Sequence, residues 1–274
     1  MVSKPRKENN AVYTRTFDVS AAGCRLRVKR IEPESVLGPM DKPTLVFLHE
    51  GLGCIEMWRD FPETLCKSAE CYGLIYDRKG YGGSEKYEEP WPVNYLQIES
   101  LLYLPALLQA CSIDDAVLIG HSDGGTIALI TAAAHGNLIR GTITEAAHIF
   151  VEKITIEGIH KTVKAFESTS LKEKLARYHD KNTKAVFYRW ADRWLSPEFR
   201  NWNIREELLN ITCPLLLLQG EDDEYGTRAQ VEGIAAGVSG PAHVKLIPEC
   251  GHTPHFQAKD TVLFEMKRFI RALF

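Results

Sequence analysis

The sequence predicts an α/β fold: a mostly parallel sheet flanked by helices, with a helical segment inserted into it. Short, continuously apolar runs alternate along the chain with segments of helical spacing, and one long interval contains no strand-like run. Continuous apolar runs are typical of strands buried on both faces. Their alternation with helices implies right-handed crossovers between parallel strands.

The individual elements follow from their periodicity. Alternating apolar and polar residues at 11–19 and 24–32 predict a hairpin. Buried strands are predicted at 44–49, 71–77, 116–122, 141–147, 214–220 and 242–248. Apolar residues at helical spacing predict helices at 55–69, 94–110, 124–135, 226–237 and 258–273.

Residues 148–205 interrupt this alternation. The interval is rich in Lys, Glu, Arg and aromatic residues and contains no convincing strand. We therefore expect a core made of residues 1–147 and 206–274, with residues 148–205 forming a helical cap or lid over the strand ends. A chain of 274 residues is long enough for one such domain with an insertion.

Composition excludes several classes of function. A formal net charge of -3 provides no basic field for nucleic acid or an acidic membrane surface. Seven cysteines without a CxxC pair argue against a disulfide framework or a zinc site. The first ten residues lack the apolar segment of a signal peptide, and the longest apolar stretch, 101–108, is too short to span a bilayer. We expect a cytoplasmic protein that acts on a small-molecule substrate, while the sequence sets no oligomeric state.

The strongest chemical signal is the pentapeptide Gly120-His121-Ser122-Asp123-Gly124. It lies between a predicted strand and a predicted helix, the context that a G-x-S-x-G elbow requires. Small residues on either side let the strand and the helix approach closely. The hydroxyl of Ser122 then projects at a helix N-terminus, which favours developing negative charge. Ser122 is therefore predicted as a nucleophile.

Further motifs accompany this elbow in a fixed order. They are His49-Glu50-Gly51-Leu52-Gly53, Asp77-Arg78-Lys79-Gly80-Tyr81-Gly82-Gly83-Ser84, Gly220-Glu221-Asp222-Asp223 and Gly251-His252. Together they resemble the α/β-hydrolase superfamily, specifically its esterase-like serine hydrolases with a helical cap, from about residue 25 to the end. The order nucleophile, acid, histidine is the order in that superfamily.

The resemblance implies the remaining catalytic residues. His252 is expected as the general base, with His255 as the nearest alternative among nine histidines. Asp223 is expected as the acid that orients His252, and Asp222 stays an alternative because the loop is generally acidic. His121 is expected to point into the packing around the elbow.

The oxyanion hole needs two backbone N–H donors. The resemblance assigns them to Asp123 and Gly51, with Leu52 as the nearest alternative to Gly51. Leu52 is also a candidate for the pocket lining. Glu50 stands where a Gly is commoner, either as a surface residue or as a polar group at the pocket edge that selects substrates or orients water. His148, which follows a strand end, is a candidate for the pocket lining.

The cap carries Phe187, Trp190 and Trp194 at helical spacing. This spacing is typical of an amphipathic helix packed on the core. A sharper hypothesis makes Trp190 and Trp194 the roof of the pocket, with Arg189 or Arg193 holding a substrate carboxylate.

These residues predict a serine hydrolase that cleaves a carboxylic ester or thioester through an acyl-enzyme. Carbon–carbon bond hydrolysis of meta-cleavage-type diketones is an alternative, although Thr253, Pro254 and His255 stand where many such enzymes carry a Trp. A non-catalytic ligand-binding or signalling protein is a third. Similar dehalogenases and epoxide hydrolases have Asp in place of Ser122, which disfavours both. We expect no metal or organic cofactor, because ligand residues do not cluster at metal spacing and the Gly-rich turns do not match a dinucleotide fingerprint.

Overall fold

The computed structural model describes residues 11–36, 42–87 and 89–274, so the segment 1–10 used above lies outside the described residues. Eight strands form one sheet in the order β1-β2-β4-β3-β5-β6-β7-β8. The hairpin strands β1 and β2, and the pair β2 and β4, are antiparallel, and the other pairs are parallel. The strands span Val12–Ala21, Cys24–Pro33, Thr44–Leu48, Gly73–Tyr76, Ala116–His121, Ile139–Glu145, Leu215–Gly220 and Ala242–Ile247. The predicted fold class is confirmed.

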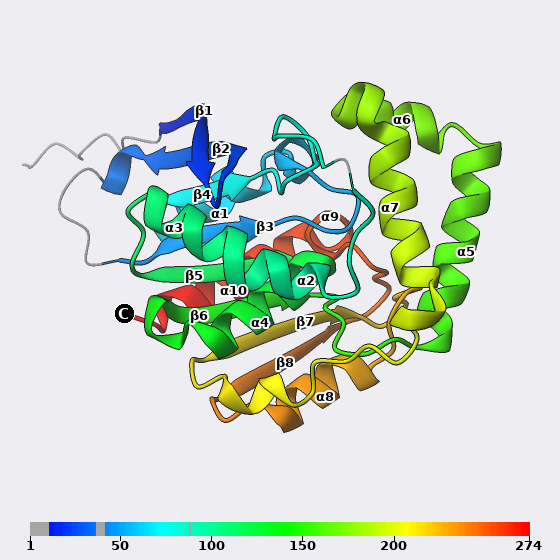
Figure 1. Ribbon diagram of the computed structural model, residues 1–274. Helices are drawn as coiled ribbons and strands as arrows, with labels where there is room; N and C mark the ends of the chain where they lie inside the picture. Colours follow the sequence, from blue (N-terminus) through cyan, green and yellow to red (C-terminus); the bar gives the residue numbers. More distant parts are fainter. Residues whose placement is uncertain (1–10, 37–41, 88) are drawn as a thin grey trace, which may run out of the picture.

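Helices cover both faces of the sheet (Figure 1). The helices of the core are α1 Phe61–Ala69, α2 Tyr95–Ile98, α3 Leu104–Ala110, α4 Asp123–Ala134, α8 Ala229–Gly237, α9 Pro254–Gln257 and α10 Lys259–Arg271. Strand β3 shows why both faces are covered: Leu45 and Phe47 pack on one side with α1 and α10, whereas Val46 and Leu48 pack on the other with α3, α4 and α8. Successive side chains of a strand point to opposite faces, so a strand buried on both faces must be apolar throughout.

Two predicted helices are shorter or less regular than expected. The segment 55–69 begins as the 3₁₀ turn Ile55–Trp58, breaks at Arg59 with φ 54°, and becomes helical only at α1, which has Pro62 in its first turn. The segment 94–110 contains a π-helical stretch, Glu99–Tyr103, between α2 and α3. Pro105 explains this change, because it has no N–H to donate to the preceding turn.

The inserted segment forms a separate group of helices beyond one end of the sheet (Figure 1). These are α5 Lys153–Ser168, α6 Leu171–His179 and α7 Thr183–Leu195. Its two ends meet, because Phe150 and Asn203 form a β-bridge and the N–H of Ile204 donates to the carbonyl of Ile149 at 2.9 Å. We propose on this basis that residues 148–205 act as a cap on the core.

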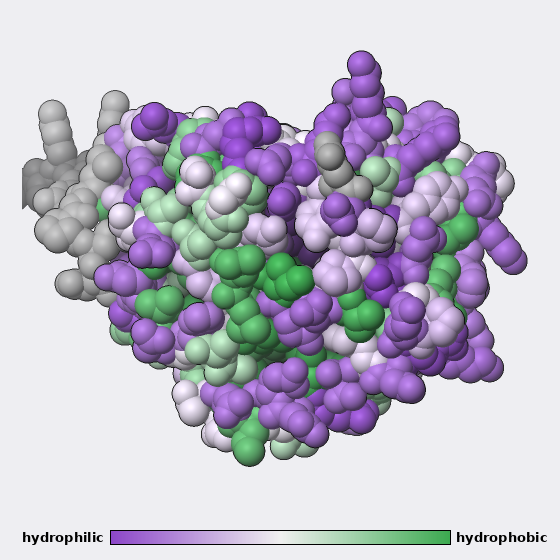
Figure 2. Space-filling model, in the orientation of Figure 1, coloured by the Kyte–Doolittle hydropathy of each residue, from purple (hydrophilic) through white to green (hydrophobic). Residues whose placement is uncertain are grey.

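The surface seen in Figure 2 is mostly polar, and apolar residues gather near its middle, over the α2–α4 region. No helix in the described residues is long and apolar enough to cross a membrane. All seven cysteines are unpaired. Within the same described ranges, no three His, Cys, Asp or Glu side chains gather as a metal site would require.

Candidate active site

The turn between β5 and α4 places Ser122 in a strained backbone conformation, with φ 53° and ψ −117°. The glycines around it are required by close contact. A Cβ on Gly120 would lie 2.1 Å from the carbonyl oxygen of Gly124, and one on Gly124 would lie 1.9 Å from that of Leu48. The strand and helix therefore cross at backbone contact, and the Ser122 side chain is left at the carboxyl end of the sheet.

The structure brings Ser122 together with two other predicted residues. His252, in the loop between β8 and α9, has its Nε2 3.0 Å from Ser122 Oγ. Its Nδ1 lies 2.8 Å from Oδ1 of Asp223, which follows β7. The three side chains follow the carboxyl ends of β5, β7 and β8, which lie at the same edge of the parallel part of the sheet, and residues 130 positions apart therefore come into contact.

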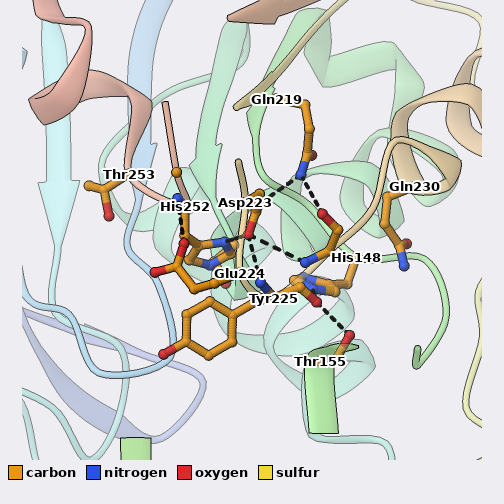
Figure 3. A network of polar contacts seen from close by, with 12 residues as sticks. His148, Thr155, Gln219, Asp223, Glu224, Tyr225, Gln230, His252 and Thr253 are labelled. Carbon is orange, nitrogen blue, oxygen red and sulfur yellow. Dashed lines mark hydrogen bonds and ion pairs between the residues drawn. The ribbon is translucent and has the colours of Figure 1, made fainter. Parts of the chain in front are cut away.

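Asp223 is held by its own loop (Figure 3). Its Oδ1 also accepts the backbone N–H groups of Tyr225 at 2.8 Å and Gly226 at 3.3 Å, and its Oδ2 accepts Gln219 Nε2 at 2.6 Å. Asp223 is buried, whereas Asp222 is exposed and its backbone N–H bonds the carbonyl of Cys250. Of the two candidate acids, only Asp223 contacts the imidazole.

Charge within the pair sets the protonation of both groups. Burial lowers the pKa of His252, but the neighbouring Asp223 charge and hydrogen bond outweigh it, and the pKa is raised from its ordinary value. Burial raises the pKa of Asp223, and the His252 contact reverses this, leaving it lowered. Both shifts favour a carboxylate that stabilises an imidazolium.

The two predicted oxyanion donors border the same site. Within the described chain, neither backbone N–H, of Gly51 or of Asp123, has a protein acceptor. The carboxyl of Asp123 is buried, accepts Tyr95 Oη at 2.9 Å and lies 3.5 Å from the Arg78 guanidinium. Trp190 of α7 covers Gly51 so closely that a Cβ there would lie 2.4 Å from the indole.

A pocket of about 270 Å³ opens beside Ser122 and His252. All five predicted lining residues border it: Glu50, Leu52, His148, Trp190 and Trp194. Several further lining residues were not predicted from the sequence, and they come from the 3₁₀ turn Ile55–Trp58, from α5, from the loops after β7 and β8, and from α9. They are Met57, Trp58, Thr155, Ile159, Glu224, Tyr225, Thr253, His255 and Phe256.

Residues 45–263 match the Alpha/beta hydrolase family. The chain belongs to this family. It is 27% identical over 196 residues to the human protein named serine hydrolase BPHL (Homo sapiens). The aligned region covers 68% of this chain and 65% of that relative. Thus the chain spans just under two thirds of the length of the curated relatives that it matches.

Solved structures share the fold at low sequence identity. The enol-lactonase from Burkholderia xenovorans LB400 aligns with a TM-score of 0.71 and 19% identity, over 93% of this chain and 100% of that one. The proline iminopeptidase of Mycobacterium smegmatis aligns with a TM-score of 0.70 and 16% identity, over 94% and 98%.

In this α/β hydrolase, the two arginines that the sequence suggested for substrate binding, Arg189 and Arg193, do not border the pocket. Arg189 lies over the rings of Tyr87 and Trp91, at 5.4 and 5.9 Å, and Arg193 donates to the carbonyl of Trp91. Both border a different cavity, which Tyr87 and Trp91 also line. The hypothesis that one of them holds a substrate carboxylate in this pocket is wrong, because neither borders it. Both side chains lie instead against Tyr87 or Trp91.

Glu50 is a pocket residue of this α/β hydrolase. Its carboxyl folds over Gly53, where a Cβ would lie 1.9 Å from Oε2. Burial raises its pKa. No Lys or Arg borders the pocket in the part of the chain that the structure describes, so Glu50 and Glu224 give it an acidic wall.

The two histidines singled out in the sequence have backbone partners. His148 Nε2 donates to the carbonyl of Tyr225 at 3.0 Å, and its ring packs against Trp194 at 5.4 Å between centroids. His121 is buried in the elbow packing, and its Nε2 donates to the carbonyl of His252 at 2.7 Å. Both rings therefore fix neighbouring parts of the pocket wall.

Proposed function

We propose that the protein is a serine hydrolase that cleaves a carboxylic ester or thioester of a small or medium substrate through an acyl-enzyme. The observation that carries the proposal is the continuous contact from Ser122 Oγ through the His252 ring to Asp223, beside a pocket that Ser122 and His252 both line. A nucleophile, a base and an orienting acid in this geometry form the catalytic unit of such enzymes.

In the proposed reaction, Ser122 Oγ attacks the carbonyl carbon while His252 Nε2 takes the hydroxyl proton. The negative oxygen of the tetrahedral intermediate is stabilised by the N–H groups of Gly51 and Asp123. The bond to the leaving oxygen or sulfur then breaks, and His252 returns its proton to that atom. Water repeats the sequence on the acyl-enzyme, with His252 again as base, and releases the acid and the free Ser122.

The pocket supports the proposed size of substrate. About 270 Å³ is near the lower end for small-molecule sites, and aromatic side chains of the cap, Trp190 and Trp194, form part of its wall. The triad residues lie in loops of the core, whereas these tryptophans belong to α7. We therefore assign chemistry to the core and choice of substrate to the cap.

The test is a panel of p-nitrophenyl esters, acyl-CoA thioesters and lactones, assayed with the wild-type protein and with Ser122→Ala. We expect turnover of at least one class, and a loss on the order of 10⁴- to 10⁶-fold in kcat in the variant. A fluorophosphonate should label the wild-type protein at Ser122. Turnover unchanged in Ser122→Ala would refute the proposal, and tight binding without turnover or labelling would favour a binding protein.

A further inference from the structure

A second acid–imidazole pair lies beside the proposed triad. Glu145 ends β6, and His255 is in α9, just after the loop that carries His252 (Figure 1). One carboxylate oxygen, Glu145 Oε2, accepts both the backbone N–H and the ring Nδ1–H of His255, each at 2.9 Å. Both residues are buried. A buried carboxylate that accepts two donors is a strong and directional contact.

Glu145 also contacts the nucleophile turn directly. Its backbone carbonyl accepts the N–H of Ser122 at 2.8 Å. One residue therefore joins the nucleophile through its main chain to the histidine loop through its side chain. These are segments more than 100 positions apart in the sequence.

His121 adds a parallel connection. It precedes Ser122, and its Nε2 donates to the backbone carbonyl of His252 at 2.7 Å. Its ring packs against those of both His252 and His255, with centroids 5.2 and 5.0 Å away. The loop from His252 to His255 is thus tied at its first residue by the elbow and at its last residue by β6.

The loop needs such ties because it has little regular structure of its own. Residues 250–253 belong to no helix or strand, and α9 has only four residues. Yet the loop must hold His252 Nε2 at 3.0 Å from Ser122 Oγ. A misplacement of about 1 Å in such a contact can cost on the order of 100-fold in rate.

We propose that Glu145 and His255 are positioning residues, which hold the His252 loop at the working distance from Ser122. This inference rests on the proposed function. The aromatic neighbours of His255, Trp58 at 4.7 Å and Phe61 at 5.5 Å between centroids, fix its ring in the plane that Glu145 requires. The pair acts on catalysis through His252.

The experiment compares His255→Asn with His255→Leu. The two introduced side chains have nearly the same shape, but only the amide retains an N–H donor close to the position of Nδ1. The readout is the second-order rate of fluorophosphonate labelling at Ser122, measured by intact mass, together with kcat and KM on any ester that is turned over. We expect His255→Leu to label about 10- to 100-fold more slowly, with kcat reduced by a larger factor than KM is raised. His255→Asn should recover most of the rate.

Controls separate this inference from folding and from the proposed function. His243→Leu makes the same substitution at an exposed histidine of β8 and should label at the wild-type rate. If His255→Leu does not fold, Glu145→Gln and Glu145→Leu form a second pair, in which Gln keeps an acceptor oxygen and should retain the higher rate. A folded His255→Leu that labels as fast as the wild type would overturn the inference. Failure of the wild type to label would instead reject the proposed function.

Discussion

Replacement of Asp223 by Asn tests how the acid acts on His252. A change of this kind in a catalytic triad can leave the imidazole in the wrong tautomer, at a loss on the order of 10⁴-fold in kcat. The surroundings of Asp223 predict a smaller loss here. Two backbone N–H groups, from Tyr225 and Gly226, donate to Oδ1, the same oxygen that faces His252 Nδ1. They require an oxygen at that position, so the Asp223→Asn side chain is expected to keep its carbonyl toward His252.

The amide nitrogen introduced by Asp223→Asn would then face Gln219 Nε2, which now donates to Asp223 Oδ2 at 2.6 Å. Gln219 can relieve this contact by turning its amide, because its Oε1 has no partner among the described residues. This rotation of the Gln219 amide breaks the 3.2 Å hydrogen bond from its Nε2 to the carbonyl of Gly226. Loss of one such bond costs about 0.5–1.5 kcal/mol of stability.

The catalytic loss should therefore reflect charge alone. At a separation of about 4 Å and an effective dielectric constant of about 20, a carboxylate stabilises an imidazolium by up to about 4 kcal/mol. A loss of about 2–4 kcal/mol corresponds to roughly 30- to 900-fold in kcat.

Stopped assays of kcat on a reactive ester, beside Asp222→Asn and Asp223→Ala, measure this effect. Asp222→Asn should be near the wild type, because that side chain is exposed. Asp223→Ala, which removes the acceptor as well as the charge, should be the slowest of the three. A loss near 10⁴-fold in Asp223→Asn would refute the argument and show that the amide nitrogen faces His252. A larger effect of Asp222→Asn would move the acid to Asp222.

The protonation of His252 and the walls of the pocket are open to test in the same way. The Asp223 contact outweighs burial and raises the pKa of His252, which must be neutral to act as a base. The kcat/KM of the wild type should therefore rise with pH through a value above about 6.5. A pH–rate series on Asp223→Asn should place this rise at lower pH. Trp190→Ala should alter relative kcat/KM across an acyl-length series, by about 1–3 kcal/mol for each methylene that loses its contact. The variant should still be labelled by a fluorophosphonate. An unchanged acyl-length profile in a folded variant would show that Trp190 serves packing alone. Esters with a free carboxylate on the acyl chain should react at least about tenfold more slowly than neutral esters of equal length, since Glu50 and Glu224 form an acidic wall. Glu50→Gln should reduce this difference in rate. Equal rates for both esters in the wild type would contradict this reasoning.

The sequence predicted the sheet well because its strands are buried on both faces. Runs such as 44–49 and 116–122 are apolar at most positions, and β3 and β5 fall within them. The breaks within helices were harder to predict, since the π-helical stretch at Glu99–Tyr103 depends on how Pro105 is accommodated rather than on periodicity.

Local motifs also located Ser122, His252 and Asp223, because each stands in a turn whose glycines and acids are visible in the sequence. The contact of Glu145 with His255 could not be predicted in this way. It joins a strand end to a helix 110 residues later, and neither residue belongs to a recognisable motif. The packing of Arg189 and Arg193 against Tyr87 and Trp91 likewise depends on the rotation of α7 about its axis, which the spacing of the aromatic residues leaves open.

The contact between Trp190 and Gly51 limits how such a protein can be rebuilt. The indole occupies the space that any side chain at position 51 would need. A cap taken from another hydrolase therefore has to present a flat ring at this point, or else the loop after β3 must be exchanged with it. Chimeras that exchange residues 148–205 alone would leave a hole above Gly51 or drive a side chain into its backbone. Recombination libraries for this chain should accordingly take α7 and the segment from Glu50 to Gly53 from the same parent protein.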